Sequence, residues 1–426
     1  MYDHIVQAEQ ITIDKAPCNN GRATFPQVPV ICEIYGEAND HNGVPKPVIV
    51  ILPFFLGSAH AAGHTAIDAK TKKRTNVGYW DGLIGPGAAM DTDRYRVISF
   101  GPLISSHFGP KLVDPTTRKP YGSTFPDFAF ADYAAIQRRA LEQLGVRHVD
   151  VLVGASMGSM QAWHLAAADL SFVSRLLLVV PSGMSLADRT RIISRQWVQA
   201  LESDPDWAHG DYYPPAKGKP PVHAMPRVLA DFWYRVQFPL DHAVMYDLES
   251  VELLEHANLG PHAVIDVKSV DEVLAGLDKK DPRVKAYADT LVKLVKVTDH
   301  NELLWQLRAI QTFDPIAVMK QSDAVAFVTL GDREPTDAVP QGSTLHEVLL
   351  IATESDDVFE SSALDRTLGL MPSLGVRAYK VSLPPALPHA AGLASAGLAG
   401  LARQIGAFIN RGSPQVAAAE HPAARL

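Results

Sequence analysis

A serine flanked by two glycines has the clearest potential for chemistry in this chain. The apolar run Val149–Val153 leads into Gly-Ala-Ser-Met-Gly at positions 154–158, and a helical pattern follows over Ser159–Ala167. Such a strand–turn–helix needs glycine on both sides of the serine, because the turn is strained and packs closely against its neighbours. At the start of the helix, the amide of Met157 can face a developing negative charge. The pattern predicts that Ser156 is a nucleophile in acyl transfer.

A serine hydroxyl is a weak nucleophile until a base removes its proton, so this hypothesis requires a histidine and an orienting acid later in the chain. His389 follows an apolar run, in a proline-rich loop, and precedes a helical pattern over Ala394–Ile409. This is the position expected of the base. The candidates for the acid lie at the end of the run Val348–Thr353 or in the loop before it: Asp356, Asp357, Asp332 and Asp337. The residues alone leave the choice among these four open.

The elements that must position these residues form an α/β pattern. Apolar runs bounded by Gly, Pro or Asp recur at wide spacing, and several are apolar at nearly every position, as is typical of parallel strands covered on both faces. A helical pattern at Tyr133–Leu144 lies between two of them. The predicted strands are Val28–Tyr35, Val48–Phe55, Arg96–Phe100, Val149–Val153, Arg175–Val180, Val348–Thr353 and Arg377–Leu383. We therefore expect a mostly parallel central sheet with helices on both faces.

The strand pattern stops between Val180 and Val348. Helical patterns with proline-rich interruptions and charged amphipathic stretches fill this part of the chain. We expect a helical lid domain over residues 184–319, inserted where it can cover the carboxyl ends of the strands. Residues 1–183 and 320–412 then form the α/β core, and residues 413–426 form a flexible tail rich in Ala and Pro.

Composition and charge argue against several function classes. The 426 residues are 47% hydrophobic and 20% charged, which is ordinary for a globular chain. A formal net charge of -8, without a basic cluster, argues against a nucleic-acid partner. No run is apolar enough for a signal peptide or a membrane span, so we expect neither secretion nor membrane association. Cys18 and Cys32 are too few for a disulfide framework, which predicts free thiols and a cytoplasmic location.

Further blocks of the sequence are distinctive as well. Tyr79–Gly87 reads Tyr-Trp-Asp-Gly-Leu-Ile-Gly-Pro-Gly, residues 119–123 read Lys-Pro-Tyr-Gly-Ser, and Leu56–Gly63 reads Leu-Gly-Ser-Ala-His-Ala-Ala-Gly. In the predicted lid, Gly-Asp-Tyr at 210–212 and Asp-His-Asn at 299–301 follow in order. Together with the serine segment, these blocks resemble the homoserine O-acetyltransferase-like family of the α/β-hydrolase superfamily. The resemblance covers the chain from about residue 10 to residue 410.

This resemblance implies an α/β-hydrolase fold, an acyl-enzyme on Ser156, no metal or bound cofactor, and a homodimer assembled through the lid. The family's pattern at the strand end favours Asp356 over Asp357 as the acid. It also supports His389, although Pro388 and Ala390 stand where the family usually has Gly and Asp. The same register implies an oxyanion hole formed by backbone amides of Met157, Phe55 and Leu56.

Three residues are implied to bind substrate: Arg227, Tyr234 and His107. Arg227 matches the family position that grips the homoserine carboxylate, for which a guanidinium fork is well suited. His107 and Phe108, in contrast, stand in a loop where the transferases carry small residues along the route to the serine. Because the sequence of this loop, Gly101–Pro110, differs from that of the transferases, the surroundings of an acyl acceptor would differ as well.

The expected substrate is a small-molecule acyl ester or thioester. The loop Gly101–Pro110 favours hydrolysis of short-acyl carboxylic esters, with water as the acceptor. Homoserine O-acetylation with acetyl-CoA is the alternative, and Arg227 favours it. A third interpretation, an inactive hydrolase-fold binding protein, predicts that one of the three catalytic residues is missing, and none is missing from the sequence.

Overall fold

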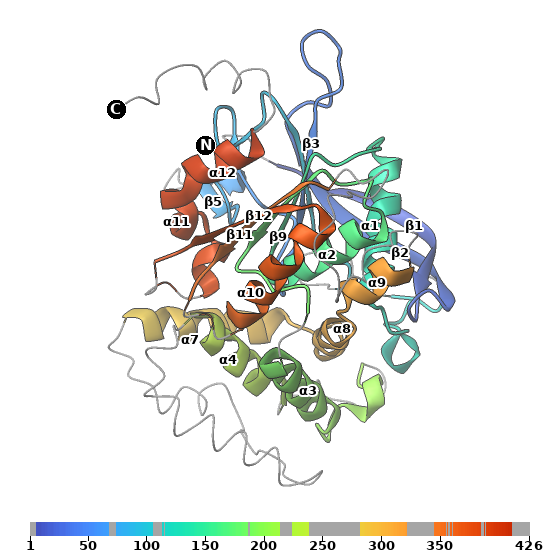
Figure 1. Cartoon of the computed structure of the whole chain (residues 1–426). Coiled ribbons are helices and arrows are strands. Elements are labelled where there is room, and N and C mark those ends of the chain that lie inside the picture. Colours follow the sequence, from blue (N-terminus) through green and yellow to red (C-terminus); the bar gives the residue numbers. More distant parts are fainter. Residues whose placement is uncertain are drawn as a thin grey trace.

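A central sheet of eight strands organises the chain (Figure 1). The computed structural model describes residues 6–67, 74–104, 113–114, 116–185, 188–213, 224–237, 282–321, 345–354, 356, 358–359, 361–384, 387 and 389–410. In the order in which they pair, the strands are β1 (Glu9–Cys18), β2 (Ala23–Tyr35), β8 (Arg96–Phe100), β3 (Val48–Leu52), β9 (Val151–Ala155), β10 (Arg175–Val179), β11 (Glu347–Ala352) and β12 (Arg377–Ser382). β1, β2 and β8 pair antiparallel, and all further neighbours pair parallel. The predicted α/β class with a mostly parallel sheet is confirmed.

The parallel strands in the middle of the sheet are buried along their whole length. Every residue of β3, β9, β10 and β11 is buried. Because side chains alternate along a strand, Val48, Val50 and Leu52 of β3 pack into one hydrophobic cluster, while Ile49 and Ile51 pack into another. Helices α1 (Phe130–Gln143) and α2 (Met157–Ala168) contribute to the first cluster, and α12 (Ala402–Ile409) contributes to the second. The sheet is therefore covered on both faces.

The edge of the sheet differs from the sequence-based expectation. The predicted strand Val28–Tyr35 is the second part of the longer β2, and β1 was not predicted at all. Residues of β1 alternate irregularly between exposed and buried positions, so they form no apolar run. Two short pairs were also missed: β4 (His64–Ile67) with β5 (Arg74–Val77), and β6 (Ile84–Gly85) with β7 (Met90–Asp91).

Helices connect β10 to β11. They are α3 (Asp188–Glu202), α4 (Ala224–Gln237), α7 (Pro282–Val297), α8 (His300–Gln311) and α9 (Pro315–Gln321). In Figure 1, α3, α4, α7 and α8 lie together on one side of the sheet. Two further helices, α10 (Ser361–Leu370) and α11 (Ser395–Leu398), belong to the part of the chain after β11. We call the described helices of residues 188–321 the helical insertion; the exact division into core, lid and tail stays a prediction.

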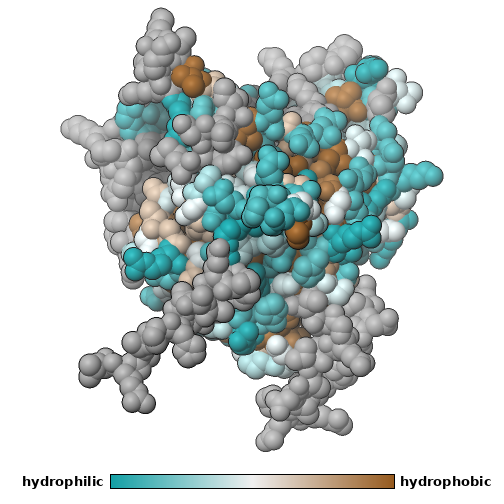
Figure 2. Space-filling view, turned by 90° about the horizontal axis from the view of Figure 1, so that it is seen from above, coloured by the Kyte–Doolittle hydropathy of each residue, from teal (hydrophilic) through white to brown (hydrophobic). Residues whose placement is uncertain are grey.

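The surface and the cysteines agree with a chain whose apolar residues are mainly inside. Hydrophilic residues cover most of the described surface on the face seen in Figure 2, and hydrophobic residues are scattered among them. Among the described helices, none has both the length and the apolar character needed to cross a bilayer. Cys18 and Cys32 are buried and free, as predicted, and burial raises the pKa of the Cys32 thiol to about 12.

Candidate active site

Ser156 lies at the turn between β9 and α2, in a backbone conformation that residues with a side chain rarely adopt. Its φ is 51° and its ψ is -121°, and such a conformation costs about 1–3 kcal/mol. The neighbouring glycines are required by packing, because a Cβ on Gly154 would lie 2.3 Å from the Gly158 carbonyl oxygen, and one on Gly158 would lie 2.4 Å from that of Leu52. The Ser156 amide donates to the Val179 carbonyl at 3.0 Å, which anchors the strained turn to β10.

His389 lies beside this serine. Its Nε2 is 2.9 Å from the Ser156 Oγ, and its Nδ1 is 2.7 Å from an Asp356 carboxylate oxygen. Because an ionised carboxylate can only accept a hydrogen bond, Nδ1 carries the proton and Nε2 accepts from the serine hydroxyl. Ser156, His389 and Asp356 are only 3%, 1% and 6% exposed. The structure thus brings the three predicted residues together in a geometry that allows proton transfer from serine to imidazole.

The backbone holds the Asp356 carboxylate in place. Its Oδ1 accepts hydrogen bonds from the amides of Val358 at 2.7 Å and Phe359 at 3.0 Å, while its Oδ2 faces the imidazole. The Phe359 ring packs against the His389 ring, with centroids 5.6 Å apart. The other predicted candidates for the acid lie outside the described residues: Asp332, Asp337 and Asp357.

Two side chains hold the segment that carries His389. The Thr353 hydroxyl donates to the Leu387 carbonyl at 2.7 Å, and the Trp80 indole N–H donates to the Gly392 carbonyl at 3.2 Å. Trp80 belongs to one of the distinctive sequence blocks, but no local pattern indicates that it meets the histidine segment. Through these contacts, the residue after β11 and the block at 79–87 hold the segment on either side of His389 in the sequence.

The amides expected to form an oxyanion hole lie next to the serine. Met157 is the first residue of α2, and amides at a helix start have no carbonyl partner within the helix. Phe55 and Leu56 follow β3, where Leu56 has a φ of 58°. Neither the Phe55 amide nor the Met157 amide donates a hydrogen bond to another described residue. The Gln161 side chain donates to the Pro53 carbonyl at 3.0 Å, which ties this loop to α2.

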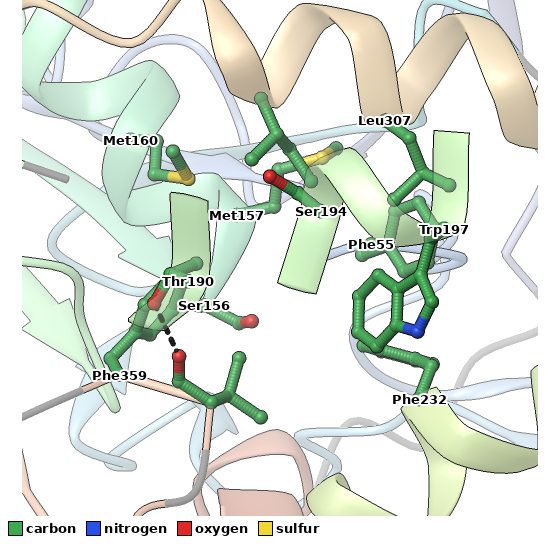
Figure 3. A pocket seen from close by; sticks show the side chains of 12 residues that line it. Phe55, Ser156, Met157, Met160, Thr190, Ser194, Trp197, Phe232, Leu307 and Phe359 are labelled. Atoms are coloured by element: carbon green, nitrogen blue, oxygen red, sulfur yellow. Dashed lines mark hydrogen bonds between the residues drawn. The ribbon is translucent and has the colours of Figure 1, made fainter. Parts of the chain in front are cut away.

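A small apolar pocket adjoins Ser156 (Figure 3). Its cavity volume is ≈ 30 Å³. The core contributes Phe55, Ser156, Met157, Met160, Val358 and Phe359, and the helical insertion contributes Thr190, Ser194, Trp197, Phe232, Leu307 and Ile310. The described residues that line this pocket include no charged side chain. The pocket therefore suits a short uncharged group better than a carboxylate.

Known proteins share this architecture. A family model for the alpha/beta hydrolase fold matches residues 47–219. A homoserine O-acetyltransferase from Bacillus anthracis is similar with a TM-score of 0.71 at 23% identity, over 96% of this chain and 98% of that one. Esterase E22 is similar with a TM-score of 0.70 at 25% identity, over 95% of this chain and 100% of that one. The chain has the α/β-hydrolase fold and is similar to homoserine O-acetyltransferases.

The sequence relatives include homoserine O-acetyltransferases as well. A homoserine O-acetyltransferase from Methanocorpusculum labreanum is 37% identical over 197 residues, which cover 45% of this chain and 37% of the relative. The chain spans about half the length of the first curated relatives that it matches. The likeness therefore supports the family and the fold, while the substrate is a separate question.

None of the three residues predicted to bind substrate is among the described residues that line the Ser156 pocket. Arg227 lies in the first turn of α4, and it is not among the described residues that line the Ser156 pocket. Tyr234 lies in the same helix, but its side chain is outside the described residues, as is the whole of His107. Their roles stay predictions.

A buried polar network joins Tyr35, Glu33 and His60. It was not predicted from the sequence. The Tyr35 hydroxyl donates to Glu33 at 2.6 Å and accepts from the amides of Ala61 and Ala62 at 2.9 and 3.0 Å. The His60 Nδ1 lies 2.9 Å from the same carboxylate. Burial alone would lower the pKa of His60, but the hydrogen bond and the charge of Glu33 outweigh it and raise the pKa. Nothing local in the sequence indicated that these residues meet, because they come from different elements.

Metal binding was not expected, and the described residues contain no group of three His, Cys, Asp or Glu side chains that could hold an ion. The prediction that the chemistry needs no metal or cofactor rests on the family resemblance and stays a prediction.

Proposed function

We propose that this protein hydrolyses short-acyl carboxylic esters through an acyl-enzyme on Ser156. The observation that carries the proposal is the hydrogen-bonded chain from Ser156 to His389 to Asp356, buried beside a small apolar pocket. The similarity to esterase E22 over 95% of this chain supports the choice of water as the acyl acceptor. So does the absence of charged side chains from the described lining of the pocket, since a homoserine acceptor needs a partner for its carboxylate.

In the acylation step, the His389 Nε2 takes the proton of the Ser156 hydroxyl as Oγ bonds to the ester carbonyl carbon. The carbonyl electron pair moves to oxygen, and the amides of Met157 and Phe55 stabilise the resulting oxyanion; the loss of one such donor costs about 3 kcal/mol of barrier. The tetrahedral intermediate then expels the alcohol, which takes the proton from His389. Asp356 keeps the imidazole oriented and stabilises its positive charge.

In the deacylation step, His389 takes a proton from water as the water oxygen bonds to the acyl carbon. A second tetrahedral intermediate forms in the same oxyanion hole. It collapses with release of the carboxylic acid, and Ser156 recovers its proton from the imidazolium. The same residues thus serve both halves of the reaction, and only the acceptor differs between a hydrolase and a transferase.

Homoserine O-acetylation with acetyl-CoA is the second candidate function. The name of the Methanocorpusculum labreanum relative favours it, and the family position matched by Arg227 favours it as well. In this case an amino-acid hydroxyl replaces water in the second half of the reaction. The acyl-enzyme then has to be shielded from water.

Two assays of the purified protein separate these candidates. Hydrolysis of p-nitrophenyl acetate without any added acceptor is the expected result, with little CoA release from acetyl-CoA when L-homoserine is present. Efficient, homoserine-dependent CoA release would make the protein a transferase instead. Ser156→Ala should lower either activity by at least about 10⁴-fold, whereas Ser203→Ala, at an exposed position after α3, should not.

The homodimer and the cytoplasmic location belong to this proposal as expectations. The dimer rests on the family resemblance, and the location rests on the two free thiols. Analytical ultracentrifugation of the full chain tests the first, with two chains per particle as the expected result.

A further inference from the structure

Three aromatic rings close one side of the pocket next to Ser156. We call Phe55, Phe232 and Trp197 the aromatic wall. The centroids of Phe55 and Phe232 are 4.8 Å apart with the ring planes at 79°, and those of Trp197 and Phe232 are 5.9 Å apart at 84°. Edge-to-face packing of this kind is favourable beyond the area that it buries. The wall is thus a continuous packed layer that joins Phe55, in the segment after β3, to α3 and α4.

Hydrogen bonding fixes the Trp197 ring of this wall. The Trp197 indole N–H donates to the Asp231 carboxylate at 2.8 Å, and this carboxylate also pairs with Arg235 at 3.1 Å. The side chains of Asp231 and Arg235 are only 16% and 10% exposed. A partly buried ion pair holds its members more firmly than an exposed one, because water screens it less. The Trp197 ring is therefore held both by this hydrogen bond and by its contact with Phe232. Its displacement by a substrate would cost free energy.

The position of the wall indicates which part of an ester meets it. In Figure 3, Trp197 and Phe232 lie on the opposite side of the pocket from Phe359, whose ring packs against His389. The alcohol must leave on the side of His389, because it takes its proton from that imidazole. The acyl chain then extends in the other direction, toward the aromatic wall.

The cavity volume sets the length of that chain. A cavity must offer about 10–15 Å³ to hold one water-sized group, so ≈ 30 Å³ accommodates only a few heavy atoms. We infer that the aromatic wall restricts the acyl group to acetyl or propionyl and that Trp197 determines this limit. The inference rests on the proposed acyl-enzyme at Ser156, but not on the identity of the acceptor.

Trp197→Ala tests this inference through the acylation step alone. The burst of p-nitrophenolate that accompanies acylation is compared for the acetate and hexanoate esters of p-nitrophenol. The wild type should prefer acetate. Hexanoate has four more methylene groups than acetate, and each methylene group buried in an apolar site contributes about fourfold to the rate constant, so the variant should raise the hexanoate-to-acetate ratio by up to about 250-fold.

Matched variants keep this test interpretable. Trp197→Phe keeps an aromatic ring but opens less space, so its ratio should lie between those of the wild type and Trp197→Ala, even if the alanine variant folds poorly. Trp233→Ala removes a half-buried indole of α4 that does not line the described pocket, and it should leave the ratio within twofold of the wild type.

The outcomes separate this inference from the proposed function. Equal acylation by both esters in the wild type, or an unchanged ratio in both Trp197 variants, would overturn the role of the wall. A burst that favours acetate over hexanoate in the wild type, but that is not followed by steady turnover, would contradict ester hydrolysis and still support the wall. If no p-nitrophenolate were released from either ester, neither in a burst nor in steady turnover, both proposals would be contradicted, because Ser156 would then not be acylated.

Discussion

At the scale of single residues, Ser156 and Asp356 are positioned by the backbone around them. Ser156 has a φ of 51° and lies between Gly154 and Gly158, where a side chain would clash with the backbone. Asp356 accepts two amide hydrogen bonds through one oxygen and leaves the other for His389. The imidazole is therefore oriented by a carboxylate that is itself fixed, which favours the tautomer with the proton on Nδ1.

Asp356→Asn should separate orientation of the histidine from packing. The asparagine oxygen can still accept from the amides of Val358 and Phe359, so its NH₂ group has to face the His389 Nδ1. That nitrogen must then accept, and the proton moves to Nε2, where it blocks transfer from Ser156. We expect kcat for p-nitrophenyl acetate to fall by about 10⁴-fold, with little change in the circular dichroism spectrum.

Asp365→Asn provides the matched control, since the Asp365 side chain is 64% exposed and pairs only with Lys380 among the described residues. Its kcat should stay close to that of the wild type. An Asp356→Asn variant that keeps more than a tenth of wild-type kcat would mean that another carboxylate orients His389.

At the scale of elements, a buried histidine joins α2 to the start of α9. The His164 Nε2 accepts a hydrogen bond from the Asp314 amide at 3.1 Å, and the ring packs against both Phe130 and Phe313. His164 is 2% exposed. Burial lowers its pKa to about 4, and the nearby Asp314 carboxylate only partly opposes this shift. His164 is therefore neutral in the folded protein near pH 7.

This shift predicts that the free energy of unfolding depends on pH. Between pH 6.5, the ordinary pKa of histidine, and pH 4, the unfolded chain binds a proton that folded His164 does not bind. Stability should then fall by about 1.4 kcal/mol for each pH unit of acidification. Above pH 6.5 and below pH 4, this residue adds no further dependence.

Urea unfolding of the wild type and His164→Gln at several pH values measures this effect, because the glutamine keeps an acceptor for the Asp314 amide and does not titrate. The difference in stability between the two proteins should shift in favour of the variant on acidification. A difference that is constant from pH 7 to pH 4.5 would show that His164 is protonated in the folded state as readily as in the unfolded one.

The local sequence signal of each element explains whether it could be predicted. The strand–turn–helix around Ser156 was predictable because its signal is local: an apolar run, two glycines and a helical pattern within about 20 residues. Strand β1 was not, since it pairs along the edge of the sheet and has no apolar run. For the acid, the residues alone left four candidates open, and the family pattern, not the spacing, favoured Asp356. The contact of Glu33 with His60 joins segments 27 residues apart, and no local pattern indicates it.

At the scale of the whole molecule, one hydrophobic cluster runs from the sheet into the helical insertion. It contains Val50 and Leu152 of the central strands as well as Leu229 and Leu303 of the insertion. Trp305 of α8 packs against Phe125 of the core, with ring centroids 4.0 Å apart, and is 5% exposed. Because the pocket at Ser156 is lined by both parts, the site depends on this shared cluster for its shape.

We therefore expect the core and the insertion of the wild type to unfold in urea as one unit, with coincident transitions by tryptophan fluorescence and far-ultraviolet circular dichroism. Trp305→Ala should lower the free energy of unfolding by about 3–5 kcal/mol and separate the two transitions, because it removes the ring that joins the parts. Trp305→Phe keeps a ring at this position and should preserve the single transition. Two separate transitions in the wild type would mean that the insertion folds without the core, and the pocket would then be an interface between independent units.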